Sequence, residues 1–258
     1  MGCSVADLLG WLDERFPPQT AEPWDTVGLQ VGDPSAQVER VLVALDPTEE
    51  SLEEARRKGA SALIVHHPAW IGSLKCIVKG EPVGRIIWKA IQSEVSILCV
   101  HTNLDRSLGG PNDLLARKLG LSALEILGCG LGRIGDLDRP LTLEELCKIV
   151  SGELGPSRIV GDPQKVIKKV AVICGSGSSM MEEAKRAGAD VLITGDVKYH
   201  NARQAQAMDM AVIDPGHFAT ERMSVSWLAD SLREVSRERN WGLDVLEFQG
   251  EKDPFWVP

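Results

Sequence analysis

The sequence predicts an α/β protein made of two similar lobes that arose by internal duplication. Strand and helix patterns alternate along the chain, and one stretch occurs twice. Residues 53–67 read EEARRKGASALIVHH and residues 182–196 read EEAKRAGADVLITGD. At a constant offset of 129, eight of these fifteen positions are identical. Such a match at one fixed spacing indicates a duplicated supersecondary unit.

The first copy reads as strand, helix and strand. VERVLVALD (38–46) passes from alternation into a continuous apolar run, which predicts a strand. Asp46, Pro47 and Glu49 predict a capping box with Asp46 as the N-cap, and Gly59 is placed to end the helix. ASALIV (60–65) predicts the second strand. A helix over 81–94 then leads into a third strand, VSILCV (95–100).

The second copy repeats this plan. KKVAVIC (168–174) predicts a strand, Ser179 and Glu182 a capping box, Gly188 a helix stop and ADVLIT (189–194) a strand. A helix over 201–209 and a strand over 210–214 follow. Strand, helix and strand at this spacing predict a right-handed βαβ unit with parallel strands.

We therefore expect a first lobe over 1–128, a second over 129–239, and a C-terminal strand and tail over 240–258 that packs back on the lobes. Between the repeats, Thr142 and Glu145 predict a capping box that opens a helix over 141–155, and SRIVGD (157–162) predicts a short strand.

Charge and hydropathy restrict the partners. The chain has 28 basic and 37 acidic side chains, a net charge of −9, and no basic block. A nucleic-acid or anionic-membrane partner would need a dense Lys/Arg face, so neither is expected. No apolar run approaches the length of about 18 residues that a membrane span requires. The first sixteen residues lack the basic start of a signal peptide.

The cysteines predict the compartment. Six of them (Cys3, Cys76, Cys99, Cys129, Cys147, Cys174) are scattered without a C-x-x-C pair. Without a secretory signal we interpret them as reduced thiols, several of them buried in strands, and we expect a cytoplasmic protein.

Every histidine of the chain follows a predicted strand. His66 and His67 end ALIV, His101 ends SILCV with Asp105 four residues on, and MAVID leads to the pair His217 and Glu221. VLIT leads to Lys198 and His200. In parallel α/β sheets, ligands bind at the carboxyl ends of the strands.

Each of these features also has a simpler interpretation. A histidine at a strand end is often a hydrogen-bonded structural residue, Asp105 after a strand is often an N-cap, and His217 with Glu221 fits a surface helix. Adjacent residues in a strand point to opposite faces, so His66 and His67 share a site only where the chain leaves regular structure, as Pro68 suggests.

Together the side chains suggest a metal site, since imidazole and carboxylate without thiolate suit Zn, Fe, Mn, Co or Ni. Two adjacent imidazoles that diverge suit two ions better than one. Two such ions would lower the pKa of a bridging water to about 7. CGSGSSM (174–180) fits either an anion-binding turn or a tight turn, and it lacks a P-loop lysine.

The motifs WDTVGLQVG, ALIVHHPAW, HTNLDRSLGGPNDLLARKLGL, GRIGDL, VLITGDVKYHNARQA and DPGHFATER resemble, in this order, the Nif3-like family of dinuclear-metal proteins, the type 2 GTP cyclohydrolase homologues. The resemblance covers about residues 24–228 and is to the short form without an inserted domain. One departure is Thr26, where the family often has Asn.

This resemblance implies two α/β lobes with two metal ions in the cleft between them, and a toroidal homohexamer. The implied metal ligands are His66, His67, Asp105, His217 and Glu221. Either Glu221 or Asp105 would bridge the ions, and Glu221 is also the candidate catalytic residue. His101 would be a further ligand or would hold Asp105, and Lys198 and His200 would contact a substrate anion.

Three functions fit these expectations. The first is a metal-dependent hydrolase, cyclohydrolase-like or a phosphoesterase, acting on a nucleotide-like or phosphorylated small molecule. The second is a non-enzymatic metal-binding, metal-delivery or scaffold protein, and the third is a regulatory protein that acts on other macromolecules. The number of polar residues near the expected ligands favours the enzyme.

Overall fold

The computed structural model describes residues 2–128 and 130–256 and has a mixed α/β fold, which confirms the predicted fold class. The chain forms two compact units. Unit 1 comprises residues 2–107 and Ser224–Pro254, and unit 2 comprises Leu108–Met223 with residues 255–256. The expected lobe limits, 128/129 and 239/240, differ from these, and residue 129 lies outside the described part of the chain.

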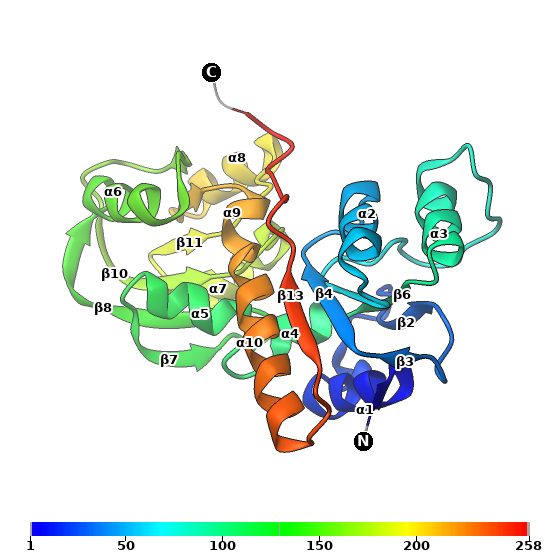
Figure 1. Ribbon diagram of the computed structural model, residues 1–258. Helices are drawn as coiled ribbons and strands as arrows, with labels where there is room; N and C mark the ends of the chain where they lie inside the picture. Colours follow the sequence, from blue (N-terminus) through cyan, green and yellow to red (C-terminus); the bar gives the residue numbers. More distant parts are fainter. Residues whose placement is uncertain (1, 129, 257–258) are drawn as a thin grey trace. The chain divides into compact units, whose positions relative to one another are not determined.

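Unit 1 is built on a five-stranded sheet with the order β13-β4-β5-β6-β2 (Figure 1). Four of its strands are parallel: β4 (Arg40–Ala44), β5 (Ala62–Val65), β6 (Ser96–Cys99) and β13 (Asp244–Glu247). β2 (Gly28–Val31) is antiparallel to β6, and β1 (Cys3–Ser4) forms a separate antiparallel pair with β3 (Gln37–Val38). The late strand expected after residue 240 is therefore an edge strand of this sheet.

Helices cover the sheet of unit 1. α2 (Glu49–Lys58) and α3 (Pro82–Gln92) pack on the face that carries Leu42, Leu63 and Ile97. Figure 1 shows α1 (Val5–Arg15) on the other side of the sheet. Val41 and Val43, which alternate with Leu42, are also fully buried, so both faces are covered. The remaining helices are η1 (Pro18–Thr20), α4 (Thr102–Arg106) and α10 (Met223–Glu238).

Unit 2 is built on a six-stranded sheet with the order β7-β8-β10-β11-β12-β9. Its parallel centre consists of β10 (Val166–Val172), β11 (Val191–Ile193) and β12 (Ala211–Asp214). β7 (Ser122–Ile126), β8 (Arg133–Thr142) and β9 (Arg158–Val160) extend it by antiparallel pairing.

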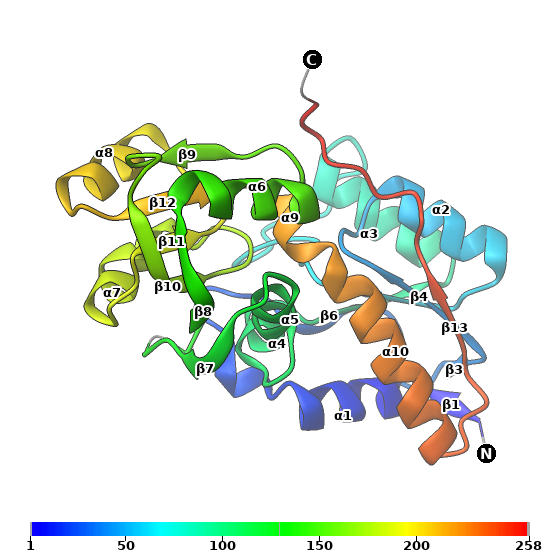
Figure 2. The ribbon, with the colours of Figure 1, turned by 90° about the vertical axis from the view of Figure 1, so that its left-hand side faces the viewer.

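Two layers of helices enclose this sheet, and Figure 2 shows them on its opposite sides. α5 (Pro111–Lys118) and α6 (Leu143–Leu154) pack on the face that carries Val170 and Ile193. α7 (Met181–Arg186) and α8 (Tyr199–Ala207) pack on the face that carries Ala171 and Leu192. η2 (Ser178–Met180) precedes α7, and α9 (His217–Glu221) follows β12.

The repeat corresponds to the same element order in both units. Unit 1 contains β4-α2-β5-α3-β6 and unit 2 contains β10-α7-β11-α8-β12, with neighbouring strands parallel. Val41 pairs with Ala62, and Val170 pairs with Val191, which are the same positions at the offset of 129. The predicted parallel βαβ units are confirmed, and their match supports the inference of duplication.

Two of the three predicted capping boxes are wrong. α2 begins two residues later than expected, with Thr48 as the N-cap in a reciprocal box with Ser51, because the Asp46 carboxylate binds His67 instead. α7 has no side-chain cap, because the turn η2 places Ser179 inside a 3₁₀ helix. The box of Thr142 with Glu145 is confirmed at the start of α6.

The cysteines agree with the expected burial. Cys99 lies in β6 and Cys174 follows β10, and both are buried. Cys3, Cys76, Cys99 and Cys147 are free thiols, and Cys129 lies outside the described residues.

Candidate metal centre

The adjacent histidines begin where β5 ends. β5 stops at Val65, so His66 and His67 have left the regular strand, and their rings lie 4.9 Å apart at 49°. The backbone N–H groups of both residues donate to the carbonyl of Leu45, at 3.2 and 2.9 Å. This departure from strand geometry allows both imidazoles to face one region, which is the condition that the sequence analysis gave for a shared site.

His101 joins this pair. It follows β6 and caps α4, and its ring lies 5.2 Å from that of His66 and 5.5 Å from that of His67. One ring nitrogen from each of the three histidines lies within 4.8 Å of the others. The three imidazoles of unit 1 could therefore hold a metal ion.

Asp105 adds a carboxylate to the three imidazoles. It lies in α4, one turn after His101, and its side chain is buried. Its Oδ1 lies 3.8 Å from Nε2 of His66. Asp105 is not the N-cap of α4, since His101 holds that position. The structure thus brings the three predicted imidazoles of unit 1 together and places Asp105 next to one of them.

The second group lies in unit 2. α9 begins at His217 and ends at Glu221, so the two side chains share a face, and Nε2 of His217 lies 2.8 Å from Oε2 of Glu221. Glu221 is buried. The predicted pairing of imidazole and carboxylate one helical turn apart is confirmed.

All four of these histidines are held through Nδ1. The acceptors are the carbonyl of Val100 for His66 at 3.0 Å, Asp46 for His67 at 2.8 Å, Asp25 for His101 at 2.8 Å and Asp196 for His217 at 2.7 Å. A carbonyl or carboxylate oxygen can only accept, so Nδ1 carries the proton. This turns the Nε2 edge of each ring away from these acceptors, and Nε2 is the atom through which an imidazole held at Nδ1 binds a metal.

Asp25 is the most enclosed of these acceptors. Its side chain is fully buried and accepts hydrogen bonds from His101 Nδ1, from the backbone and hydroxyl of Thr102, and from the Thr26 backbone. Burial raises the pKa of this carboxyl, but the hydrogen bonds from His101 and Thr102 lower it further, to about 2. Asp25 therefore stays ionised and fixes the tautomer of His101.

Sequence reasoning did not identify Asp25, Asp46 and Asp196 as functional. Asp46 and Asp196 each follow a predicted strand, and this position at the carboxyl end of a strand was the available signal. Asp25 lies in the motif WDTVGLQVG, 76 residues before His101, and nothing in the spacing connects the two. Thr26, where the motif departs from the resembled family, contacts Asp25 through its backbone N–H.

Two glycines of unit 2 leave room for the His217–Glu221 pair. Gly175 has φ +63°, and a Cβ there would lie 2.1 Å from Oε1 of Glu221. A Cβ at Gly195 would lie 2.5 Å from the backbone nitrogen of His217. A side chain at either position would displace the pair, so both glycines are needed for this geometry.

The segment CGSGSSM is a tight turn. The N–H groups of Gly175 and Gly177 donate to the hydroxyls of Thr220 and Thr194, at 2.9 and 2.8 Å. These donors are engaged within the protein and do not face an anion. Of the two interpretations of this segment, the structure supports the tight turn.

Lys198 and His200 lie at the start of α8. Lys198 caps α8 and His200 lies in its first turn, and both side chains are exposed. Tyr199 is 72% exposed, and its ring lies 5.5 Å from that of His200. Among residues 2–128 and 130–256, His200 is the one histidine that belongs to no group of neighbouring metal-ligand atoms.

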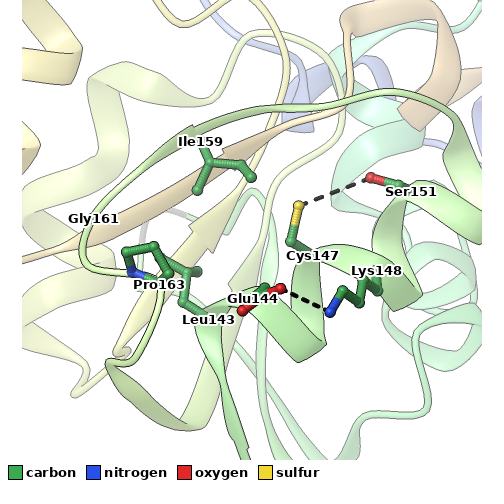
Figure 3. A pocket seen from close by; sticks show the side chains of 8 residues that line it. All are labelled: Leu143, Glu144, Cys147, Lys148, Ser151, Ile159, Gly161 and Pro163. Carbon is green, nitrogen blue, oxygen red and sulfur yellow. Dashed lines mark hydrogen bonds and ion pairs between the residues drawn. The ribbon is translucent and has the colours of Figure 1, made fainter.

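Unit 2 also has a cavity of about 460 Å³ between α6 and residues 159–163 (Figure 3). Leu143, Cys147 and Ile159 line it, and the ion pair Glu144–Lys148, at 2.8 Å, lies among its lining residues. None of its described lining residues is a candidate ligand, so this cavity is distinct from the histidine groups.

The fold and the site define a class: an α/β protein whose clustered imidazoles and carboxylates could hold a metal ion. The helices of the described residues are too short or too polar to cross a bilayer. The chain belongs to the Duf34/NIF3 (NGG1p interacting factor 3) family, whose model matches residues 3–254. The resemblance seen in the sequence is thereby confirmed.

Individual relatives match over their whole length. The GTP cyclohydrolase 1 type 2 homolog of Clostridium acetobutylicum is 35% identical over 265 residues, which cover 99% of each chain. That of Streptomyces coelicolor is 33% identical, covering 97% of this chain and 93% of its own. The crystal structure of a hypothetical protein from Staphylococcus aureus, 30% identical, superposes with a TM-score of 0.93 over 100% of both chains.

Proposed function

We propose that this protein binds two divalent metal ions and is a metal-dependent hydrolase of a nucleotide-like or phosphorylated small molecule. The observation that carries the proposal is the set of four imidazoles whose Nδ1 atoms are bound to oxygen acceptors, which makes Nε2 the metal-binding atom of each ring. Three of these rings converge in unit 1. Structural histidines at strand ends would not need to converge.

The proposed ligands are His66, His67, Asp105, His217 and Glu221, with His101 as a further ligand. The two ions accord with the imidazole cluster of unit 1, which has Asp105 next to His66, and with the pair of His217 and Glu221 in unit 2. Imidazole and carboxylate donors suit Zn, Fe, Mn, Co or Ni. When bound, such ions would supply Lewis acidity to a reaction.

The side chains of the protein would supply the rest. Glu221 is a buried carboxylate next to an imidazole, so it is placed to accept a proton. Lys198 and His200 are exposed nitrogen-bearing side chains, and they would bind an anionic group of the substrate. Relatives that carry the name GTP cyclohydrolase 1 type 2 homolog support a nucleotide-like substrate.

A non-enzymatic role in metal binding or delivery is the second candidate. It is favoured by the engagement of Asp25, Asp46 and Asp196, which hold histidines and are therefore not available as general bases. A protein built only to hold metal needs such supports but no further catalytic group.

Metal analysis of protein purified without added metal tests the metal proposal. We expect about two ions per chain in the wild type and fewer in His66→Ala and Glu221→Ala. His200→Ala is the matched control, because this histidine lies outside both ligand groups, and it should retain its metal. Fewer than about half an ion per wild-type chain would refute the dinuclear site.

A panel of nucleotides and phosphoesters separates the two functions. Turnover by the wild type that is lost in Glu221→Ala supports the hydrolase. Metal retained with no turnover of any compound supports the carrier. Unchanged substrate binding in Lys198→Ala would remove this residue from the proposed anion site.

The assembly is proposed from the family resemblance alone. We propose a homohexamer located in the cytoplasm, with a small molecule rather than a nucleic acid as the partner. The net charge of −9 supports the exclusion of nucleic acid. Light scattering on the purified protein tests the hexamer.

A further inference from the structure

The carboxylate of Glu251 lies at the end of β4, next to Asp46, the residue that accepts a hydrogen bond from His67. Glu251 belongs to the segment that follows β13, and its Oε1 accepts from the backbone N–H groups of Leu45 and Asp46, the latter at 3.3 Å. Two consecutive N–H groups that converge on one anion form a small nest. Glu251 thus replaces the neighbouring strand that β4 lacks beyond Ala44.

Leu45 and Asp46 both accept hydrogen bonds from His67. The carbonyl of Leu45 accepts from the backbone N–H of His67 at 2.9 Å, and Oδ1 of Asp46 accepts from Nδ1 of the same residue at 2.8 Å. The short segment bonded by Glu251 therefore holds His67 twice, once through its backbone and once through its imidazole.

This segment needs an anchor. The side chain of Asp46 is 45% exposed, so packing alone does not hold its carboxylate in place. The side chain of Glu251 has to reach the backbone of Leu45 and Asp46 from the C-terminal segment. The N–H of Phe248 donates to Val43 at 2.9 Å, and a Cβ at Gly250 would lie 2.6 Å from the ring of Phe248. Glycine therefore lets the chain pass close over this ring before Glu251.

We propose that Glu251 is a positioning residue for the metal centre, which acts by fixing Asp46 and, through it, the Nδ1–H tautomer and orientation of His67. The proposal rests on the proposed function in that His67 is taken as a metal ligand. Glu251 is not one of the proposed ligands, so the proposal gives the C-terminal segment its own effect on metal affinity. Groups that orient metal-binding histidines typically change affinity by about 10- to 100-fold when removed.

The test uses the full chain and Co²⁺ as the probe. Glu251→Ala should weaken Co²⁺ binding about tenfold. Glu251→Gln keeps an oxygen that accepts from both N–H groups, so it should bind Co²⁺ within about twofold of the wild type. Asp244→Ala is the matched control, because it removes an ion pair with Arg40 at the other end of the same pair of strands. It should bind Co²⁺ like the wild type.

A second measurement determines the tautomer of His67 in the metal-free protein. Solid-state NMR of histidine-labelled, metal-free protein distinguishes Nδ1–H from Nε2–H imidazoles. His67 should be the Nδ1–H tautomer in the wild type and in Glu251→Gln, and a mixture of tautomers in Glu251→Ala. If the alanine variant does not fold, Glu251→Asp replaces it, because its side chain is one methylene too short to reach both N–H groups.

The outcomes are distinct. Wild-type Co²⁺ affinity and an unchanged His67 spectrum in Glu251→Ala would overturn the proposal, as would an equal loss in Glu251→Gln or in Asp244→Ala. If the wild type itself does not bind Co²⁺, the proposed function fails, and the metal-free spectra still decide whether Glu251 positions His67.

Discussion

At the scale of single residues, the tautomer of each histidine is set by an oxygen atom behind it. Three of the four acceptors are carboxylates, those of Asp25, Asp46 and Asp196. A carboxylate accepts more strongly than a carbonyl and raises the basicity of the ring that it holds. If the proposed site holds a metal, its affinity therefore depends on these acids as well as on the ligands themselves.

Replacing Asp25 tests this dependence through pH. In the folded protein the pKa of Asp25 is lowered from 3.8 to about 2, so the ionised form stabilises the fold at pH values above about 4. That contribution is lost as the pH falls toward the folded pKa. The metal-free wild type should exceed Asp25→Asn by about 2 kcal/mol in free energy of unfolding near neutral pH.

The difference between the two proteins should shrink as the pH falls from about 4 to about 2. Denaturant unfolding at a series of pH values measures it. A difference that stays constant over that range would show that the ionised form of Asp25 is not what stabilises the fold.

Gly175→Ala tests the space behind Glu221. The added Cβ would lie 2.1 Å from Oε1 of Glu221 and 3.2 Å from Nε2 of His217, so both side chains must move, and metal binding should be lost. Gly120→Ala is the matched control in the same unit. Gly120 has φ +73°, close to the +63° of Gly175, but a Cβ there meets nothing within 4 Å.

Both glycine variants should lose about 1–2 kcal/mol of stability from backbone strain, and only Gly175→Ala should also lose metal. Metal titration together with thermal unfolding separates the two effects. Equal metal binding by the two variants would mean that Glu221 is not needed for it.

The sequence predicted the histidines of the site but not the acids that hold them. Histidines are rare in this chain and all follow strands, so their position carried information. Acidic residues are common, and the partner of each one depends on contacts that form only on folding. Asp25 and His101 are 76 residues apart, and no local pattern relates them.

At the scale of elements, periodicity predicted the strands and helices, whereas the exact start of a helix depended on competition for side chains. Two overlapping patterns precede α2, and the one that contains Thr48 and Ser51 forms because Asp46 is bound to His67. A helix cap that lies next to a functional site is therefore a poor guide to the start of the helix.

Thr142→Ala tests the capping box that the sequence predicted correctly. The hydroxyl of Thr142 accepts from the N–H of Glu145 at 3.2 Å, and the Glu145 carboxylate accepts from the N–H of Thr142 at 2.8 Å. Loss of the hydroxyl should reduce the free energy of unfolding by about 1 kcal/mol. Thr142→Ser should restore most of it, and chemical denaturation measures both. Equal destabilisation by serine would assign the effect to the lost methyl group.

At the scale of the whole molecule, the repeat predicted two α/β bodies but not how the chain is shared between them. The chain returns to the first unit at Ser224–Pro254, after Leu108–Met223 have formed most of the second, and β13 pairs with β4. Sequence alone could not choose this sheet, because a strand of only four residues fits many edges. Each unit has a hydrophobic cluster of its own: Leu63 belongs to one in unit 1 and Leu146 to one in unit 2.

Tryptophan fluorescence can follow one unit alone. Of the seven tryptophans, Trp256 alone lies outside unit 1, and unit 2 has none between residues 108 and 223. In a Trp256→Phe background, fluorescence thus reports the unfolding of unit 1, while far-UV circular dichroism reports both units. Because a unit with its own core can unfold as a unit, Leu146→Ala should lower the stability of unit 2 by about 3 kcal/mol.

This variant should move part of the circular dichroism transition to lower denaturant and leave the fluorescence transition in place. Leu63→Ala, which removes an equally buried leucine from unit 1, is the reciprocal control and should move the fluorescence transition. If both probes shift together in both variants, the chain unfolds in one cooperative step. The two cores would then be thermodynamically coupled, and a loss of metal in a variant of one unit could arise from destabilisation of the other.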